Sequence, residues 1–283
     1  MNRDAGTISA TARRLRHAAR AVVNASKFAG FDPELLARHV SRLPGFVSDF
    51  YLYRQLNKDA SFAPKLSDIM PLLDDANGAA GYIGHYFHQD LWAARKVYAR
   101  RPQKHVDIAS RIDGFVAHLL VFMPVEIVDI RPIDGGVKGL SFVQDDATEL
   151  SLFAADSVDS LSSLHAAEHF GLGRYSDPID PGASVRFMEA LQRVLAPDGR
   201  LYFSVPIGRQ RVEFNAHRIF DVRTILEVFR NLELVSFSFI GSDGYVHENA
   251  SPQQTIGMEY ACGLFEFSKS SMHPIAGDPH AAS

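Results

Sequence analysis

The sequence predicts an α/β protein with a doubly wound, seven-stranded and mostly parallel sheet, preceded by a helical N-terminal extension. From about residue 103 onward, short apolar segments alternate with segments of helical periodicity. Strands separated by helices imply right-handed crossovers, and therefore parallel neighbours that are covered on both faces. The last two apolar segments have no helical segment between them, so we expect them to form an antiparallel pair at one edge of the sheet.

The predicted extension covers residues 1–102, and its first 28 residues carry six Arg or Lys against one Asp. The segment "TARRLRHAARAVVNASKF" has helical spacing, with a thin apolar stripe of Leu15, Ala18, Val22 and Val23. A basic amphipathic helix of this kind can make weak contact with an anionic membrane surface or dock on its own domain. The sequence favours docking and leaves the membrane contact open.

Two further helices are predicted in the extension. "DPELLARHVSRL" begins with Asp32 as a cap and Pro33 at the first helical position. "HYFHQDLWAARKVYARR" is periodic and ends before Pro102. At the other end of the chain, residues 271–283 are small, polar and Pro-containing, which predicts a disordered tail.

The α/β domain is predicted over residues 103–270. Its expected strands are residues 104–110, 124–130, 139–144, 157–164, 199–206, 232–240 and 260–268, and its expected helices are residues 113–122, 183–196 and 221–231.

Composition excludes several classes of protein. A net charge of −4 and a pI near 6.3 give no general attraction to nucleic acid. The single cysteine, Cys262, excludes an intramolecular disulfide and a multi-cysteine metal site, and it fits a reducing compartment. The longest apolar runs are too short to span a bilayer, and no signal-peptide core stands at the N-terminus. We therefore expect a soluble, cytoplasmic protein.

Acidic residues follow three of the predicted strands. Asp107 lies in "HVDIASRIDG", Asp129 ends the strand in "EIVDIRP", and Asp146 precedes Ala147 in "QDDATEL". With "LQRVLAPDGRLYFSVP" and "FNAHRIFDVRTILEVF", these motifs resemble the class I S-adenosylmethionine (SAM)-dependent methyltransferases in type and order. The resemblance covers about residues 103–268. It implies SAM as cofactor and a carboxylate at Asp129 that accepts hydrogen bonds from both ribose hydroxyls.

The cofactor-binding residues that the resemblance implies are Asp107, Ala109, Ser110, Arg111, Gly114, Asp129, Ile130, Asp146, Ala147 and His165. A narrower resemblance, carried by "VDIASRIDGFVAHLL", "GRYSDPIDP" and "VEFNAHRIF", is to a methyltransferase-like family listed as a domain of unknown function.

The loop after the first strand departs from the family pattern, which is Asp-x-Gly-x-Gly-x-Gly. Here Ala109, Arg111 and Asp113 stand where glycines allow close backbone approach to the ligand, and a glycine occurs only at Gly114. This departure supports an alternative function, namely a non-catalytic binding or scaffold protein on the same fold.

"HAAEH", residues 165–169, spells the H-x-x-E-H pattern of a class of zinc proteases. A protease needs both histidines on one long helix, but this pattern directly follows a strand, and Gly171 and Gly173 end any helix soon after it. Three interpretations remain open. The residues are structural, or His165 or His169 is a general base, or His165, Glu168 and His169 bind a divalent cation. Some related O-methyltransferases carry Glu-x-x-Glu-His at this place and use it for the last purpose.

Other candidate residues surround the acceptor side. His217 is a second candidate base, with Arg209, Arg211 and Arg218 as neighbours that could bind an anionic acceptor or form a solvated face. Arg174 and Tyr175 lie in a loop that is expected to cover the acceptor. The predicted function is methylation of oxygen in a small molecule or glycan, with a sugar hydroxyl as the expected acceptor.

Overall fold

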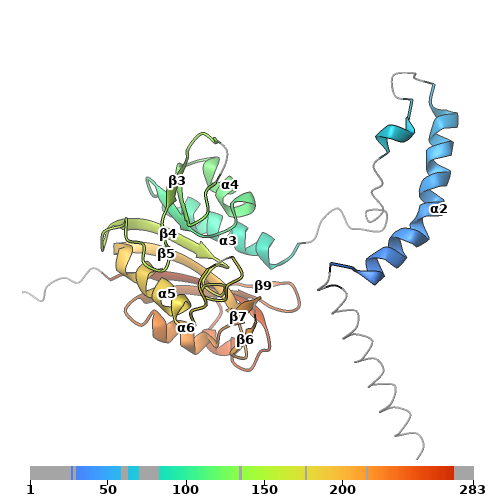
Figure 1. Cartoon of the computed structure of the whole chain (residues 1–283). Coiled ribbons are helices and arrows are strands. Elements are labelled where there is room, and N and C mark those ends of the chain that lie inside the picture. The colour runs from blue at the N-terminus through green and yellow to red at the C-terminus, as the bar shows by residue number, and fades with distance from the viewer. Residues whose placement is uncertain are drawn as a thin grey trace, which may run out of the picture. The chain divides into compact units, whose positions relative to one another are not determined.

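The computed structural model describes residues 27, 30–58, 63–69, 83–133, 136–175, 177–214 and 216–270 (Figure 1). The chain divides into two compact units, Met1–Tyr82 and Ile83–Ser283. The apolar stripe predicted between Leu15 and Val23, and with it the membrane-contacting helix, lies outside the described residues, as does the predicted tail.

In the first unit, the helix α2 (Pro33–Leu56) is followed by the short 3-10 helix η2 (Leu66–Asp68). The Asp32 side chain accepts hydrogen bonds from the backbone N–H groups of Glu34 and Leu35, which confirms the predicted cap. Within the described ranges, no helix combines the length and the apolar character needed to cross a membrane.

The second unit contains an eight-stranded sheet with the order β3-β2-β1-β4-β5-β10-β8-β9. Its strands are β1 (His105–Ile108), β2 (Val125–Asp129), β3 (Leu140–Gln144), β4 (Val158–Leu164), β5 (Leu195–Ile207), β8 (Glu233–Ile240), β9 (Val246–His247) and β10 (Ala261–Ser268). The block from β3 to β5 is parallel, whereas β10 runs antiparallel to both β5 and β8. The predicted antiparallel pair is therefore confirmed, and the two-residue strand β9 adds an edge that the sequence did not predict.

Helices cover both faces of this sheet, as a doubly wound fold requires (Figure 1). On one face, α5 (Ala183–Val194) and α6 (Val222–Val228) pack over the central strands through side chains such as Phe187 and Ile225. On the other face lie α3 (His85–Arg100) and α4 (Ala117–Leu120), the latter preceded by a π-helical turn, η4 (Ile112–Val116).

The helix α3 belongs to the second unit, although the sequence placed it in the N-terminal extension. Trp92, Ala93 and Val97 are buried and share a core with Leu119 of α4 and Leu264 of β10. The first boundary between units therefore lies after Tyr82 and not at the predicted 102/103. An amphipathic pattern shows that a helix buries one face, but it does not show which sheet receives that face.

A small hairpin between β5 and α6 also escaped prediction. Its strands, β6 (Arg211–Glu213) and β7 (His217–Ile219), form a separate two-stranded sheet. The backbone N–H of Arg218 donates to the carbonyl of Glu168, at 3.0 Å, so the hairpin is attached to the segment that leaves β4. Both segments lie at the carboxyl-end edge of the parallel strands, where ligands bind in open α/β sheets.

Candidate active site

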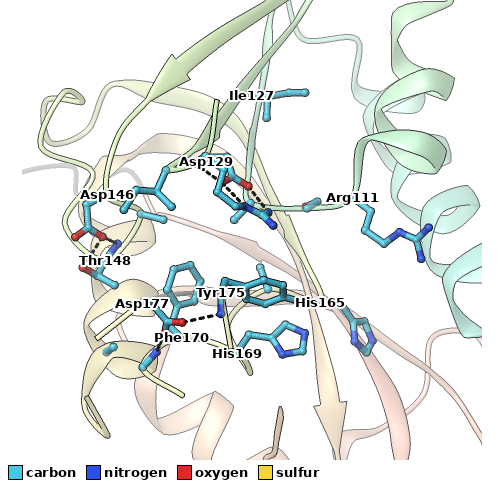
Figure 2. A pocket seen from close by; sticks show the side chains of 18 of the residues that line it. Arg111, Ile127, Asp129, Asp146, Thr148, His165, His169, Phe170, Tyr175 and Asp177 are labelled. Atoms are coloured by element: carbon cyan, nitrogen blue, oxygen red, sulfur yellow. Dashed lines mark hydrogen bonds and ion pairs between the residues drawn. The ribbon is translucent and has the colours of Figure 1, made fainter. Parts of the chain in front are cut away.

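A cavity of about 810 Å³ opens at the carboxyl ends of β1, β2 and β4 (Figure 2). Its volume lies within the range of small-molecule sites. The predicted site residues that line it are Ala109, Ser110, Arg111, Asp129, Ile130, Asp146, Ala147, His165, His169 and Tyr175. Eight predicted residues are not part of its lining, namely Asp107, Gly114, Glu168, Arg174, Arg209, Arg211, His217 and Arg218.

Asp129 ends β2 in the cavity wall, and only 8% of its surface is exposed. Both of its carboxylate oxygens are engaged by Arg131. The backbone N–H and Nε of Arg131 donate to Oδ1 at 2.8 and 3.0 Å, and its Nη2 donates to Oδ2 at 2.8 Å. The Arg131 guanidinium also lies 5.1 Å from the ring centroid of Tyr175. The carboxylate predicted to hold the ribose is therefore already occupied by a neighbouring side chain.

The loop after β1 keeps its turn with only one residue in the left-handed region. Ala109 has φ +57°, and its N–H donates to the carbonyl of Val128 at 2.9 Å. Ser110 anchors the loop, since its hydroxyl donates to Asp107 at 2.7 Å and accepts from the N–H of Leu164 at 2.9 Å. Of the positions where the family has glycine, only that of Ala109 adopts a conformation that glycine favours.

Ala109→Gly is expected to raise the free energy of unfolding by about 1 kcal/mol, because the left-handed region is strained for a residue with a Cβ. Urea denaturation measures this change. Ala117→Gly is the matched control, since Ala117 has a helical φ of −61°, and this variant should lose about 1 kcal/mol. Destabilisation by both variants would show that Ala109 is not strained.

Asp107 lies beneath this loop and not in the cavity wall. It is fully buried and accepts hydrogen bonds from the hydroxyls of Ser110 and Ser162. Its Oδ2 atom is buried without a hydrogen-bond partner among the described residues. Burial raises the pKa of its carboxyl group to about 6, although the bonds from Ser162 and Ser110 act in the opposite direction. The structure thus gives Asp107 a role in holding the loop, and its contact with the cofactor stays a prediction.

The titration of Asp107 is expected to appear in the pH dependence of stability. The pKa is about 6 in the folded protein against an ordinary value of 3.8, so its contribution to stability is full below pH 4 and is lost as the pH rises through 6. Asp107→Asn removes this titration. The variant should gain about 3 kcal/mol relative to wild type between pH 4 and pH 7, measured by urea denaturation. Parallel curves for the two proteins would contradict the raised pKa.

Gly114 supports the helix interface and does not line the cavity. A Cβ placed on Gly114 would come within 1.9 Å of Oδ2 of Asp90 on α3. The absence of a side chain at Gly114 therefore serves the close packing of η4 against α3. This contact differs from the cofactor contact that the family resemblance implies.

The loop after β3 supplies another part of the cavity wall. Asp146 and Ala147 line it together with Thr148. The Oδ1 atom of Asp146 accepts hydrogen bonds from the backbone N–H and the hydroxyl of Thr148, at 2.8 and 2.7 Å. These bonds hold the loop in a fixed turn beside Asp129.

The "HAAEH" segment follows β4 as a series of turns and contains no helix. His165 has a φ of +52°, and its Nδ1 lies 2.7 Å from Oε1 of Glu168 while its Nε2 lies 3.2 Å from Sγ of Cys262. Burial alone lowers the pKa of the His165 imidazole. The adjacent Glu168 carboxylate and the Cys262 contact outweigh burial and raise that pKa well above its usual value. His165 is therefore a poor candidate for the general base, because its imidazole already carries the proton that a base would have to accept.

His169 has the geometry of a general base. Its Nδ1–H donates to the carbonyl of Ala216 at 2.8 Å, so in the neutral ring the lone pair is on Nε2. Burial lowers the pKa of the His169 imidazole, and the Glu168 carboxylate and the Ala216 carbonyl oppose this effect only in part. A neutral histidine that lines the cavity with a fixed tautomer can accept a proton at pH 7.

The cation interpretation of the same trio does not fit this geometry. Oε1 of Glu168 is bonded to His165 and lies 3.8 Å from Nε2 of His169, and the side chain of Glu168 is only 1% exposed. In the part of the chain that the structure describes, no cluster of three or more His, Cys, Asp or Glu side chains is arranged to hold a metal ion. Glu168 pairs with His165, and His169 lies beyond hydrogen-bond distance of its carboxylate.

His217 and the nearby arginines lie outside the cavity. Nε2 of His217 is 3.4 Å from Oε2 of Glu213, and its ring centroid is 6.4 Å from that of His169. Arg209 and Arg211 pair with Glu259 and Glu213, whereas Arg218 donates to the carbonyls of Glu168 and Phe170. In this structure the arginines hold the hairpin and do not present a charged surface to the cavity.

The segment of residues 171–175 and 177–182, here called the acceptor loop, forms the wall facing Asp129. Gly171 has a φ of +75°, and a Cβ there would meet the carbonyl of Asp180 at 1.9 Å. The Asp177 carboxylate accepts from the N–H groups of Gly171 and Tyr175, at 2.7 and 3.1 Å. Tyr175 lines the cavity, whereas Arg174 donates to the carbonyl of Ala216 at 2.9 Å.

Sequence reasoning missed several lining residues, and Arg131 and Tyr86 are the two with contacts to predicted site residues that matter most. Arg131 follows Asp129 directly in "VDIRP", but no pattern marks it as a partner of that carboxylate. Tyr86 reaches the cavity from α3, with its ring 5.3 Å from that of His165 and 5.4 Å from the guanidinium of Arg111. Because α3 was assigned to the extension, Tyr86 could not have been placed at the site.

Residues 141–254 match a family model described as a Caenorhabditis protein of unknown function, DUF268. A search of curated proteins found no match. The sheet itself decides the fold class, because its parallel block ends in β5 and an antiparallel β10 lies between β5 and β8. The second unit has a Rossmann-like fold of the methyltransferase type.

Several solved structures show distant similarity to this methyltransferase fold. One is a Burkholderia thailandensis 1,6-didemethyltoxoflavin-N1-methyltransferase with bound S-adenosylhomocysteine, at 16% identity and a TM-score of 0.46, covering 85% of this chain and 92% of that one. Another is the N-methyltransferase NodS from Bradyrhizobium japonicum with S-adenosylhomocysteine, at 13% identity and a TM-score of 0.46, covering 65% of this chain and 87% of that one. A third is the cyclase SpnF, at 11% identity and a TM-score of 0.46, covering 64% of this chain and 81% of that one. Similarity at this level says nothing about the ligand or the reaction of this chain.

Proposed function

We propose that this protein is a SAM-dependent methyltransferase that acts on a hydroxyl oxygen. The observation that carries the proposal is that one cavity holds a nearly buried carboxylate, Asp129, and a neutral histidine with a free Nε2, His169. The carboxylate is suited to bind the ribose of the cofactor, and the histidine is suited to remove a proton from an acceptor.

The residues present fit SAM. Asp129 would accept hydrogen bonds from the ribose hydroxyls once Arg131 moves away, and Asp146 with Ala147 would contact the adenine. The loop at Ala109 and Ser110 would face the methionine portion, since the left-handed turn at Ala109 keeps the shape that glycine usually gives. Bound there, SAM would supply an activated methyl group.

His169 would act on the acceptor. Nε2 of His169 would accept the hydroxyl proton of the acceptor while the acceptor oxygen takes the methyl group that bound SAM would supply. The hydrogen bond from Nδ1 to the carbonyl of Ala216 holds the ring in the required tautomer, and the carbonyl oxygen stabilises the positive charge that develops on the ring. The Glu168 carboxylate, 3.8 Å from Nε2, favours the protonated ring further.

The proposed acceptor is a sugar hydroxyl in a glycan or a glycan precursor. Its support in the structure is a pair of half-exposed tyrosines in the cavity lining, Tyr86 and Tyr175, which are 39% and 44% exposed. Such flat, half-exposed rings can pack against the apolar face of a sugar while their hydroxyl groups remain in water.

Transfer of a labelled methyl group from SAM to a panel of acceptors tests the proposal. Products should form with hydroxyl-bearing sugars and not with amines of similar size. The yield of product should decrease when the pH is lowered below the pKa of His169, because the base is then protonated. If amines are methylated in preference, the oxygen assignment is wrong. If SAM binds but no acceptor is methylated, the scaffold alternative is favoured.

A further inference from the structure

We propose that Arg131 is a latch that closes the nucleoside side of the cavity and connects it to the acceptor loop. This inference rests on the proposed function, because it concerns the carboxylate that would hold the ribose. Arg131 covers both oxygens of Asp129 with three hydrogen bonds and places its guanidinium against the ring of Tyr175. A ligand with two vicinal hydroxyls and this side chain compete for the same oxygens.

The contacts continue from Asp129 to the base. The Tyr175 ring meets the His169 ring edge to face, with centroids 5.6 Å apart. In Figure 2, Tyr175 lies between Asp129 and His169. One row of contacts, Asp129 to Arg131 to Tyr175 to His169, thus joins the two halves of the cavity. Displacement of Arg131 removes a cation–π contact from Tyr175, which loosens the acceptor loop over His169.

The latch is weak enough to open. The side chain of Arg131 is 58% exposed, and an ion pair at that exposure is largely screened by water. A ligand that offers Asp129 two hydroxyl donors replaces the bonds that Arg131 made. The latched population lowers the apparent affinity for such a ligand by the fraction of molecules that are closed. Nucleoside and acceptor binding are then coupled, each favouring the other.

The chain contains a matched control for this arrangement. Asp221 and Arg223 repeat the local geometry, because the Arg223 N–H and Nε donate to Oδ1 at 2.9 and 2.8 Å and its Nη2 donates to Oδ2 at 2.6 Å. This pair caps α6, lies outside the cavity lining, and has an arginine that is 69% exposed. Arg223→Gln therefore removes an equivalent ion pair without touching the proposed latch.

Calorimetric titration with adenosine separates the latch from other effects, because adenosine carries the two hydroxyls but no charge. Arg131→Gln should bind adenosine about two- to fivefold more tightly than wild type, the range expected for losing a screened ion pair. Arg223→Gln should match wild type. With 2′,3′-dideoxyadenosine, which lacks both hydroxyls, all three proteins should bind equally. Equal or weaker adenosine binding by Arg131→Gln overturns the competition.

Hydrogen exchange provides a readout that needs no ligand. Peptides that span the acceptor loop should exchange at least about threefold faster in Arg131→Gln than in wild type, because the loop loses its contact with Arg131, while Arg223→Gln should leave them unchanged. If exchange increases but neither adenosine nor S-adenosylhomocysteine binds any of the proteins, the proposed function fails and the loop contact stands. Unchanged exchange in Arg131→Gln refutes the connection to the acceptor loop.

Discussion

His169→Ala is expected to lower kcat by roughly 10² to 10⁴ while leaving the affinity for SAM nearly unchanged. The reason is that Nε2 is free in the cavity, with the proton of the ring held on Nδ1 by the carbonyl of Ala216. No other described histidine combines a place in the cavity lining with a free ring nitrogen, since both nitrogens of His165 have partners. Turnover with a sugar acceptor, together with calorimetric titration of SAM, measures the two quantities separately.

His217→Ala is the comparison for this experiment. His217 was predicted as an alternative base, and the structure places it on the hairpin, outside the cavity lining and near Glu213. Its replacement should reduce kcat far less than the His169 replacement. A larger loss for His217→Ala than for His169→Ala would transfer the role of base to His217, and normal turnover by both variants would mean that catalysis relies on positioning alone.

Asp129→Ala is expected to weaken the binding of S-adenosylhomocysteine by about 1 to 3 kcal/mol, the cost of removing the partner of buried polar groups. The carboxylate is only 8% exposed, so water cannot readily replace it. The measured loss of binding free energy will be partly offset, because the ligand must displace Arg131 from Asp129 in the wild type but not in Asp129→Ala. Arg131→Gln combined with Asp129→Ala isolates the contribution of the carboxylate.

Asp221→Ala is the control for that affinity. It removes the same kind of Asp–Arg pair at the start of α6 and should cost stability through the lost helix cap, but it should not change ligand affinity. An Asp129→Ala variant that binds as tightly as wild type would mean that the ribose is held elsewhere.

Periodicity predicted every strand of the sheet except the short edge strand β9. Apolar segments with helices between them define β1, β2, β4 and β5, and the missing helix before β10 predicts the antiparallel partner of β8. These features are local, so they can be read one segment at a time. The placement of α3 was wrong because its buried face is defined only by Trp92 and its neighbours meeting strands far away in the sequence.

The site could be predicted only as a set of residues. Ends of strands place Asp129, Asp146 and His169 at one edge, and the cavity brings them together. Their roles depend on distant partners. The tautomer of His169 is set by Ala216, in a hairpin that has no strong strand pattern, and His165 meets Cys262 of β10. The motif "HAAEH" carries no information about either contact.

The central claim is that this cavity is a SAM site, and calorimetric titration of the wild-type protein with S-adenosylhomocysteine tests it most directly. The account predicts saturable heat with a stoichiometry of one, lost in large part in Asp129→Ala and retained in His169→Ala. Absence of both heat and thermal stabilisation at millimolar S-adenosylhomocysteine would contradict it.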